Sequence, residues 1–125
     1  MEIAKNYKWF LFDQNNSGGK LVVNDKVCHR LFIEAKNESE AISIAEGLGV
    51  YFNGVDDGRD CPCCGDRWYR AEEVEFPLAF DSRKQIVFKN PVEYAQHLAV
   101  HYTLYKNMVD SRIFYQNGIV KEVKS

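Results

Sequence analysis

The residues best able to do chemistry are three cysteines that lie within four positions, Cys61, Cys63 and Cys64. Thiolates separated by two residues, as Cys61 and Cys64 are, have the spacing of a zinc knuckle. A structural zinc site needs four ligands, and the sequence contains no second pair with this spacing. The missing ligands would have to be Cys28 with His29, or His97 with His101.

A second interpretation of the cysteine cluster needs no metal. Free cysteine behaves as a small hydrophobic side chain, so the thiols could pack in a tight loop beneath Trp68. A catalytic thiol would need an adjacent base and a group that orients this base, and the sequence shows no such set. A zinc-supported loop and a metal-free loop both stay open, and no residue is assigned as catalytic or as a metal ligand.

His97 and His101 are one helical turn apart, a spacing that can place two metal ligands on one helix face. They lie among apolar and tyrosine residues, and the intervening Leu-Ala-Val lacks the glutamate of a metalloprotease helix. Hydrogen-bonded histidines in a core or in a subunit contact are therefore the simpler expectation.

Arginine and aromatic side chains form a second group of residues that could bind a ligand. Guanidinium groups bind phosphate oxygens at two points, and aromatic rings offer faces for a base. The pair Arg67 and Trp68 follows the cysteine loop directly and is the strongest candidate. The other arginines outside clear strands or helices are Arg59, Arg70, Arg83 and Arg112.

The run Asn15-Asn16-Ser17-Gly18-Gly19 could cradle an anion, since glycines let backbone amides approach a phosphate. It has neither the spacing of a Walker motif nor that of a dinucleotide fingerprint. A turn between two strands explains the same residues, and we favour that interpretation.

The elements that must position these residues are strands and two helices. Apolar runs predict strands at Tyr7–Asp13, Lys20–Asn24 and Lys26–Ala35, which most simply form an antiparallel meander. Further strands are expected at Arg67–Ala71 and Gln85–Phe88, and Glu72–Lys84 is too mixed to assign. The pattern of Ile113–Val120 predicts a hairpin with a two-residue Asn117-Gly118 turn.

Two helices are expected. Asn37 can cap a short helix that ends at Gly49, with Glu40 at the capping-box position. Asn90 and Pro91 begin a longer helix that should run to about Asp110, with a broad apolar and tyrosine-rich face. The fold class is therefore α+β: a largely antiparallel sheet with one short helix, one long helix and a C-terminal hairpin, in a single domain over residues 1–125.

Length and charge limit the classes of function that this chain can have. A chain of 125 residues with 46% hydrophobic residues can bury a real core. The net charge of −2, from 16 basic and 18 acidic residues, argues against binding of a nucleic acid polymer. No run approaches the roughly 20 apolar residues of a membrane span, and no leader opens the chain. We therefore expect a cytoplasmic protein with no membrane partner.

Four motifs resemble a family of small bacteriophage proteins, the first type of Thoeris anti-defence protein. They are Asn15–Gly19, Val27-Cys28-His29, Tyr51-Phe52-Asn53-Gly54 and Asp60–Trp68. The resemblance covers about Tyr7 to Tyr69, and little beyond Arg70 is distinctive.

The resemblance implies a sponge and not an enzyme. Family members bind a cyclic ADP-ribose isomer, the signal of the Thoeris immune system, and keep it from its effector without cleaving it. It also implies homo-oligomers with pockets near subunit contacts, and cyclic oligonucleotides as a second ligand class in some members. It implies no cofactor and places the protein in the cytoplasm of the infected bacterial host.

Such a ligand presents two phosphates, an adenine face and ribose hydroxyls, which call for arginine, a stacking ring and amide or carboxylate side chains. On this chemistry the predicted ligand-binding residues are Arg67, Trp68, Phe80, Asn90 and Arg112. Two other functions stay open: a small interaction module supported by the zinc knuckle, and a hydrolase that acts on the same nucleotide signal.

Overall fold

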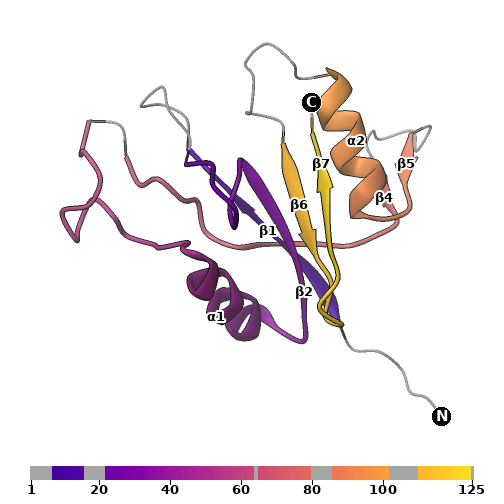
Figure 1. The fold of residues 1–125 in the computed structure, drawn as a ribbon, viewed down its shortest axis with the longest axis horizontal. Helices are drawn as coiled ribbons and strands as arrows, with labels where there is room; N and C mark the ends of the chain where they lie inside the picture. Colours follow the sequence, from indigo (N-terminus) through magenta and orange to yellow (C-terminus); the bar gives the residue numbers. More distant parts are fainter. Residues whose placement is uncertain (1–6, 16–21, 64, 80–85, 102–109, 125) are drawn as a thin grey trace.

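The computed structural model describes residues 7–15, 22–63, 65–79, 86–101 and 110–124 (Figure 1). Its elements, in chain order, are β1 (Lys8–Asp13), β2 (Arg30–Ala35), α1 (Glu38–Leu48), β3 (Glu72–Val74), β4 (Leu78–Ala79), β5 (Val87–Phe88), α2 (Pro91–His101), β6 (Ser111–Phe114) and β7 (Val120–Val123).

A five-stranded sheet in the order β3-β1-β2-β6-β7 forms the centre of the molecule. Three of its four strand pairs are antiparallel, and β2 and β6 are parallel. The short strands β4 and β5 pair with each other apart from this sheet. The predicted α+β class with a largely antiparallel sheet and a C-terminal hairpin is confirmed. The parallel contact between β2 and β6 was not predicted.

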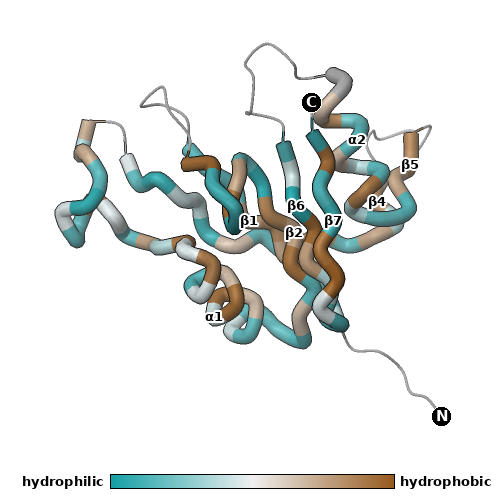
Figure 2. The backbone as a smooth tube through the Cα atoms, in the orientation of Figure 1, coloured by the Kyte–Doolittle hydropathy of each residue, from teal (hydrophilic) through white to brown (hydrophobic). Residues whose placement is uncertain are grey.

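The two faces of the sheet carry separate cores. Successive residues of a strand point to opposite faces, so Phe10 and Phe12 belong to one cluster and Leu11 to the other. Ala41 and Ala45 of α1 are buried in the first cluster, and Ala95 and Ala99 of α2 in the second. The helices therefore cover opposite faces (Figure 1), and the most apolar part of the chain runs through the central strands (Figure 2).

Helix α1 begins and ends where its capping residues predict. The Asn37 side chain accepts a hydrogen bond from the Glu40 amide (2.8 Å), and the Glu40 carboxylate accepts one from the Lys36 amide (2.8 Å). Gly49 ends the helix with φ +112°, a left-handed conformation that glycine adopts without a Cβ clash.

Helix α2 begins as predicted, since the Asn90 side chain accepts a hydrogen bond from the Glu93 amide (3.0 Å). It is described as far as His101, and the remainder of the predicted helix, residues 102–109, lies outside the described residues. His97 packs its ring on Phe88, with 5.0 Å between the ring centroids.

The predicted second strand is wrong for its described residues, Val22–Asn24, which form no strand. The side chain of Gln14 takes the place of a strand partner: its Oε1 accepts from the Val22 amide (2.8 Å), and its Nε2 donates to the Val22 carbonyl (2.7 Å). The third strand begins at Arg30 and not at Lys26, because the Asn24 side chain accepts from the Lys26 and Val27 amides and forms a turn.

The bounds of the later strands also differ from the predicted ones. Within the predicted strand Arg67–Ala71, only Trp68 forms a bridge, to Gln14, and pairing with β1 resumes at β3. The described part of Gln85–Phe88 contains the two-residue strand β5.

The C-terminal hairpin has a three-residue connection in place of the predicted two-residue turn. The Tyr115 amide donates to the Ile119 carbonyl (2.9 Å), and Gly118 adopts φ +94° inside this closure.

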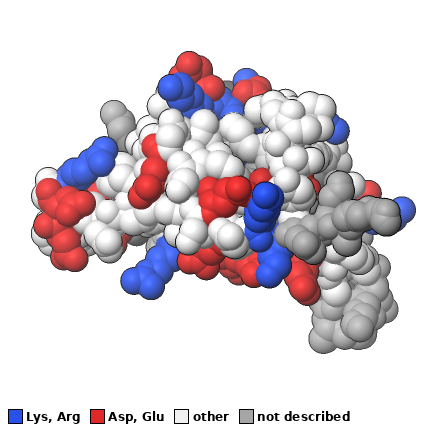
Figure 3. Space-filling view, turned by 90° about the horizontal axis from the view of Figure 1, so that it is seen from below, with Lys and Arg blue, Asp and Glu red and all other residues white. Residues whose placement is uncertain are grey.

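No described helix has the length and apolar character needed to cross a membrane. Basic and acidic side chains are interspersed on the face that Figure 3 shows, and uncharged residues cover much of its middle.

Candidate functional site

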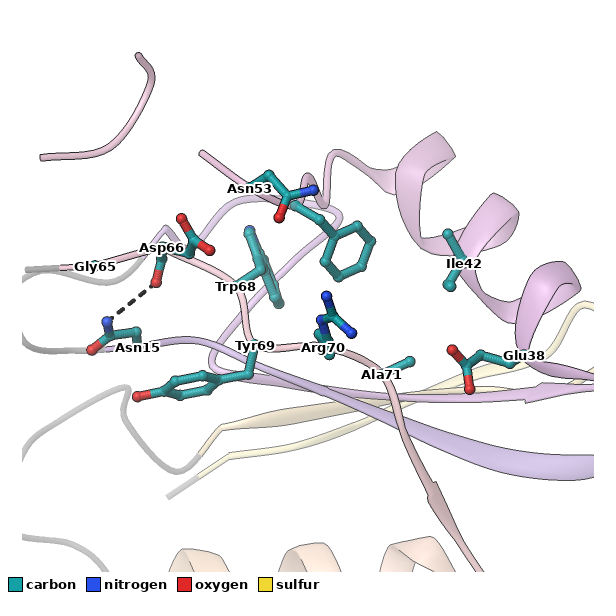
Figure 4. A pocket seen from close by; sticks show the side chains of 11 residues that line it. Asn15, Glu38, Ile42, Asn53, Gly65, Asp66, Trp68, Tyr69, Arg70 and Ala71 are labelled. Carbon is teal, nitrogen blue, oxygen red and sulfur yellow. Dashed lines mark hydrogen bonds between the residues drawn. The ribbon is translucent and has the colours of Figure 1, made fainter. Parts of the chain in front are cut away.

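A cavity of about 540 Å³ lies between the first turns of α1, the segment that follows Val50, and the extended segment before β3 (Figure 4). Its aromatic lining consists of Phe52, Trp68 and Tyr69. Its polar lining consists of Asn15, Glu38, Asn53, Asp66 and Arg70. The cavity therefore combines stacking faces, side-chain amides and charges of both signs.

The extended backbone at Trp68 explains how the ring and the cation reach the same cavity. The Tyr69 amide donates to the Asp13 carbonyl (3.0 Å), and the Asn15 amide donates to the Arg67 carbonyl (2.7 Å), so the segment lies along the end of β1. Residues i and i+2 of an extended chain point to the same side. Trp68 and Arg70 therefore both face the cavity, as Figure 4 shows.

The two side chains differ in burial. Trp68 is 3% exposed and belongs to the core cluster on the α1 face. Arg70 is exposed, and in the described part of the chain it makes no side-chain hydrogen bond or ion pair. A fixed ring thus stands beside a guanidinium that is available to a ligand.

Asp66, two residues before Trp68, ties the Trp68 end of the cavity to neighbouring segments. Its Oδ1 accepts from the Val55 amide (2.9 Å), and its carbonyl accepts from the Asn15 Nδ2 (3.2 Å, dashed in Figure 4). The carboxylate of Asp60 ties the same loop together, since it accepts from the Tyr51 hydroxyl and from the Arg67 amide, both at 2.8 Å. Three of these four side-chain hydrogen bonds join a backbone group, and together they hold the wall in place without a ligand.

A family model for a domain of unknown function, DUF7296, matches residues 7–122. The chain belongs to the DUF7296 family. The match runs from β1 into β7 and so includes all residues that line the cavity. Comparisons with curated proteins and with solved structures gave no match.

The DUF7296 structure describes four of the five sequence-predicted ligand residues and does not place all four at one site. Trp68 lines the cavity. Arg67 lies next to it, but its Nη1 donates to the Asn15 carbonyl (3.2 Å), so this guanidinium contacts the cavity wall. Phe80 lies outside the described residues.

Asn90 and Arg112 do not line this cavity. Asn90 caps α2 on the other face of the sheet. Arg112 is on β6, where its Nε pairs with Glu122 of β7 at 2.9 Å. The sequence therefore identified the cavity residue Trp68 directly; of the other described candidates, Arg67 lies beside the cavity, and Asn90 and Arg112 do not line it.

Three charged lining residues are absent from the sequence-based site: Asp66, whose carboxylate bonds the Val55 amide, and Arg70 and Glu38. Two signals pointed to Arg70: its place two residues after Trp68, and the exposure expected of a guanidinium in an extended segment. Glu38 lies 30 residues away in sequence from Trp68. It lines the same cavity because α1 packs against the sheet, and the sequence alone does not predict this packing.

A second cavity of about 530 Å³ lies beside the edge strand β3. Its charged lining consists of Glu72, Glu73 and Glu75. This cluster of carboxylates would repel phosphate, so the first cavity is the better candidate for an anionic ligand.

The described cysteines of the loop differ from the metal-free interpretation, in which the thiols pack beneath Trp68. Cys61 and Cys63 are exposed, with 2.6 Å between their sulfur atoms, so they do not pack beneath Trp68. Cys28 is buried, and its thiol contacts the carbonyls of Arg30 (3.4 Å) and Asp110 (3.5 Å). Burial raises the pKa of Cys28 to about 11.

Among the described residues, Cys28 and His29 do not gather with the exposed thiols into a metal-binding group. His29 points its Nε2 at the Asp13 Oδ1 (3.2 Å). Within the ranges that the structure describes, no three histidine, cysteine or acidic side chains gather where they could hold a metal ion. Cys64 lies outside these ranges.

Proposed function

We propose that this DUF7296 protein is a sponge for a nucleotide signal: it binds a cyclic ADP-ribose isomer, sequesters it without cleaving it, and so blocks Thoeris immune signalling in an infected bacterial host. The observation that carries the proposal is the pairing of the available Arg70 guanidinium with the fixed Trp68 ring in one cavity.

The cavity chemistry suits each part of such a ligand. The Arg70 guanidinium can bind two phosphate oxygens at once. Phe52 is half-buried in the lining and offers a face on which adenine can stack. Asn53 supplies an amide to ribose hydroxyls. The volume lies within the range of about 300 to 1,000 Å³ that is typical of small-molecule sites.

The motifs that carry the resemblance to the phage family also support the proposal. Three of these four motifs contribute to the cavity: Asn15 from the first, Phe52 and Asn53 from the third, and Asp66 and Trp68 from the fourth. Motifs that are far apart in sequence thus converge on one cavity.

The proposal is tested by calorimetric titration of the purified protein with cyclic ADP-ribose isomers, and with cyclic oligonucleotides as a second ligand class. We expect wild type and Lys121→Ala to bind at least one cyclic ADP-ribose isomer. Lys121 lies on β7 at the far edge of the sheet and serves as a control for loss of one positive charge. Arg70→Ala should bind roughly tenfold more weakly or worse, because a charge-assisted hydrogen bond is lost.

The fate of the ligand separates capture from hydrolysis. The complex is incubated, denatured by heat, and the released nucleotide is analysed by chromatography. Recovery of intact ligand supports a sponge, whereas a product that accumulates with time identifies a hydrolase. Binding of no nucleotide, together with stoichiometric zinc in protein prepared without chelator, would favour the interaction module.

We also propose that the protein forms a homo-oligomer, a dimer or larger. The expected contact is the broad apolar and tyrosine-rich face that the sequence predicts for the second helix, of which α2 is the described part. Light scattering at micromolar concentration measures this state, and a strict monomer would contradict it.

A further inference from the structure

Three groups follow one another along the first cavity: the aromatic lining at Phe52 and Trp68, the Arg70 guanidinium, and the Glu38 carboxylate. In the view of Figure 4 the guanidinium lies between Trp68 and Glu38, and all of these residues line the same cavity. The cavity wall therefore carries an aromatic ring, a cation and an anion, in this order.

Glu38 is not needed by the fold in the way that its neighbour Glu40 is. Glu40 completes the capping box of α1 through the Lys36 amide (2.8 Å). In the described part of the chain, Glu38 makes no side-chain hydrogen bond and no ion pair, and it is not paired with Arg70 across the cavity. Two opposite charges thus face one cavity, each with its binding capacity unused.

We propose that Glu38 is a specificity-determining residue, which makes the cavity select a nucleoside diphosphate whose second phosphate is esterified to another sugar. This inference rests on the proposed function and adds to it the residue that sets the ligand selectivity of the same cavity. The order of groups in such a compound is base, phosphates and distal sugar, which matches the order ring, cation and carboxylate on the wall.

The carboxylate discriminates in two ways. It accepts hydrogen bonds from the hydroxyls of the distal ribose, and hydrogen bonds to a charged acceptor are stronger than neutral ones. A nucleoside diphosphate with a free terminal phosphate has no donor at this position and brings additional negative charge toward Glu38, so it is repelled. Arg70 alone would favour the more highly charged compound, and Glu38 reverses this preference.

The experiment compares ADP-ribose with ADP as calorimetric probes. The proteins are wild type, Glu38→Gln and the matched control Glu46→Gln. Glu46 is exposed on α1 and does not line the cavity, so its change removes the same charge from the same helix. The readout is the ratio of the two dissociation constants, which a general loss of stability would leave unaltered.

We expect wild type and Glu46→Gln to bind ADP-ribose about tenfold more tightly than ADP. Glu38→Gln should reduce this ratio by about three- to tenfold, with weaker binding of ADP-ribose and tighter binding of ADP. An unchanged ratio in Glu38→Gln, or equal affinities in wild type, would overturn the role of Glu38 while leaving nucleotide capture intact. If wild type binds neither probe and no cyclic ADP-ribose isomer, the proposed function and this inference both fail.

Discussion

The Asp60 carboxylate accepts a hydrogen bond from the backbone amide of Arg67 at 2.8 Å and thereby closes the cysteine loop. The same carboxylate accepts one from the Tyr51 hydroxyl (2.8 Å), so it joins the chain that follows α1 to the segment that lines the cavity. The position of Trp68 and Arg70 therefore depends on a carboxylate that lies outside the cavity lining.

Asp60→Ala should lower the free energy of unfolding by roughly 1 to 3 kcal/mol, because the Arg67 amide and the Tyr51 hydroxyl lose their acceptor. Urea denaturation measures the change. Asp56→Ala is the matched control, since Asp56 is exposed in the same loop and should change the stability by less than about 0.5 kcal/mol. Equal stability of the two variants would show that Asp60 does not hold the loop.

Two glycines give opposite expectations for the same substitution. A Cβ at Gly54 would collide with the Asp60 carboxylate and approach the Tyr51 ring, whereas a Cβ at Gly47 in α1 meets nothing within 4 Å. Gly54→Ala should destabilise by roughly 1 to 3 kcal/mol, because Asp60 must move from its partners. Gly47→Ala should stabilise by roughly 0.5 to 1 kcal/mol through better helix propensity.

Thermal and urea unfolding of both glycine variants check this pair. A Gly54→Ala protein as stable as wild type would mean that the loop adapts at no cost. In that event the cavity wall would be less rigid than its hydrogen bonds indicate.

Elements set by local signals could be predicted from the sequence. The cap at Asn37 and the stop at Gly49 act within a few residues, and both ends of α1 were correct. The second predicted strand failed because its residues satisfy their backbone through the side chain of Gln14, a long-range partner that hydrophobic pattern does not reveal. The parallel pairing of β2 with β6 joins segments about 80 residues apart, and the hydrophobic pattern could not predict this pairing either.

The cavity residues also divide into those that a local sequence pattern predicts and those that depend on long-range contacts. Trp68 was predicted, because an aromatic residue after a constrained loop is a local pattern. The choice of Arg67 over Arg70 depended on which side of an extended segment each guanidinium faces, and that is fixed by the pairing of Trp68 with Gln14. Glu38 enters the cavity only through the packing of α1 on the sheet.

Arg67→Ala distinguishes a bracing role from a ligand-binding role. The Arg67 guanidinium donates to the Asn15 carbonyl (3.2 Å), so its loss should loosen the wall and lower stability by roughly 0.5 to 1.5 kcal/mol. We expect its effect on nucleotide affinity to be smaller than the roughly tenfold or greater loss in Arg70→Ala. Calorimetry on both folded variants checks this order. A larger loss in Arg67→Ala would favour the sequence-based assignment of Arg67 as the phosphate ligand.

The buried thiol of Cys28 should make the protein less stable in alkaline solution. Burial raises its pKa from 9.0 to about 11, so the unfolded chain loses this proton at lower pH than the folded protein does. The stabilisation is therefore complete below pH 9 and is lost as pH rises toward 11, a fall of roughly 2 to 3 kcal/mol.

Urea denaturation between pH 8 and 11 measures this fall, and Cys28→Ala is the comparator because it lacks the thiol. The variant should show a smaller decrease over the same range, although its stability at pH 8 is lower through the small cavity that it leaves. Alkylation at pH 8 gives an independent check: exposed Cys61 and Cys63 should react in the folded protein, while Cys28 should react only after denaturation. Equal pH profiles of wild type and Cys28→Ala, or rapid alkylation of Cys28, would show that this thiol is not held neutral by the core.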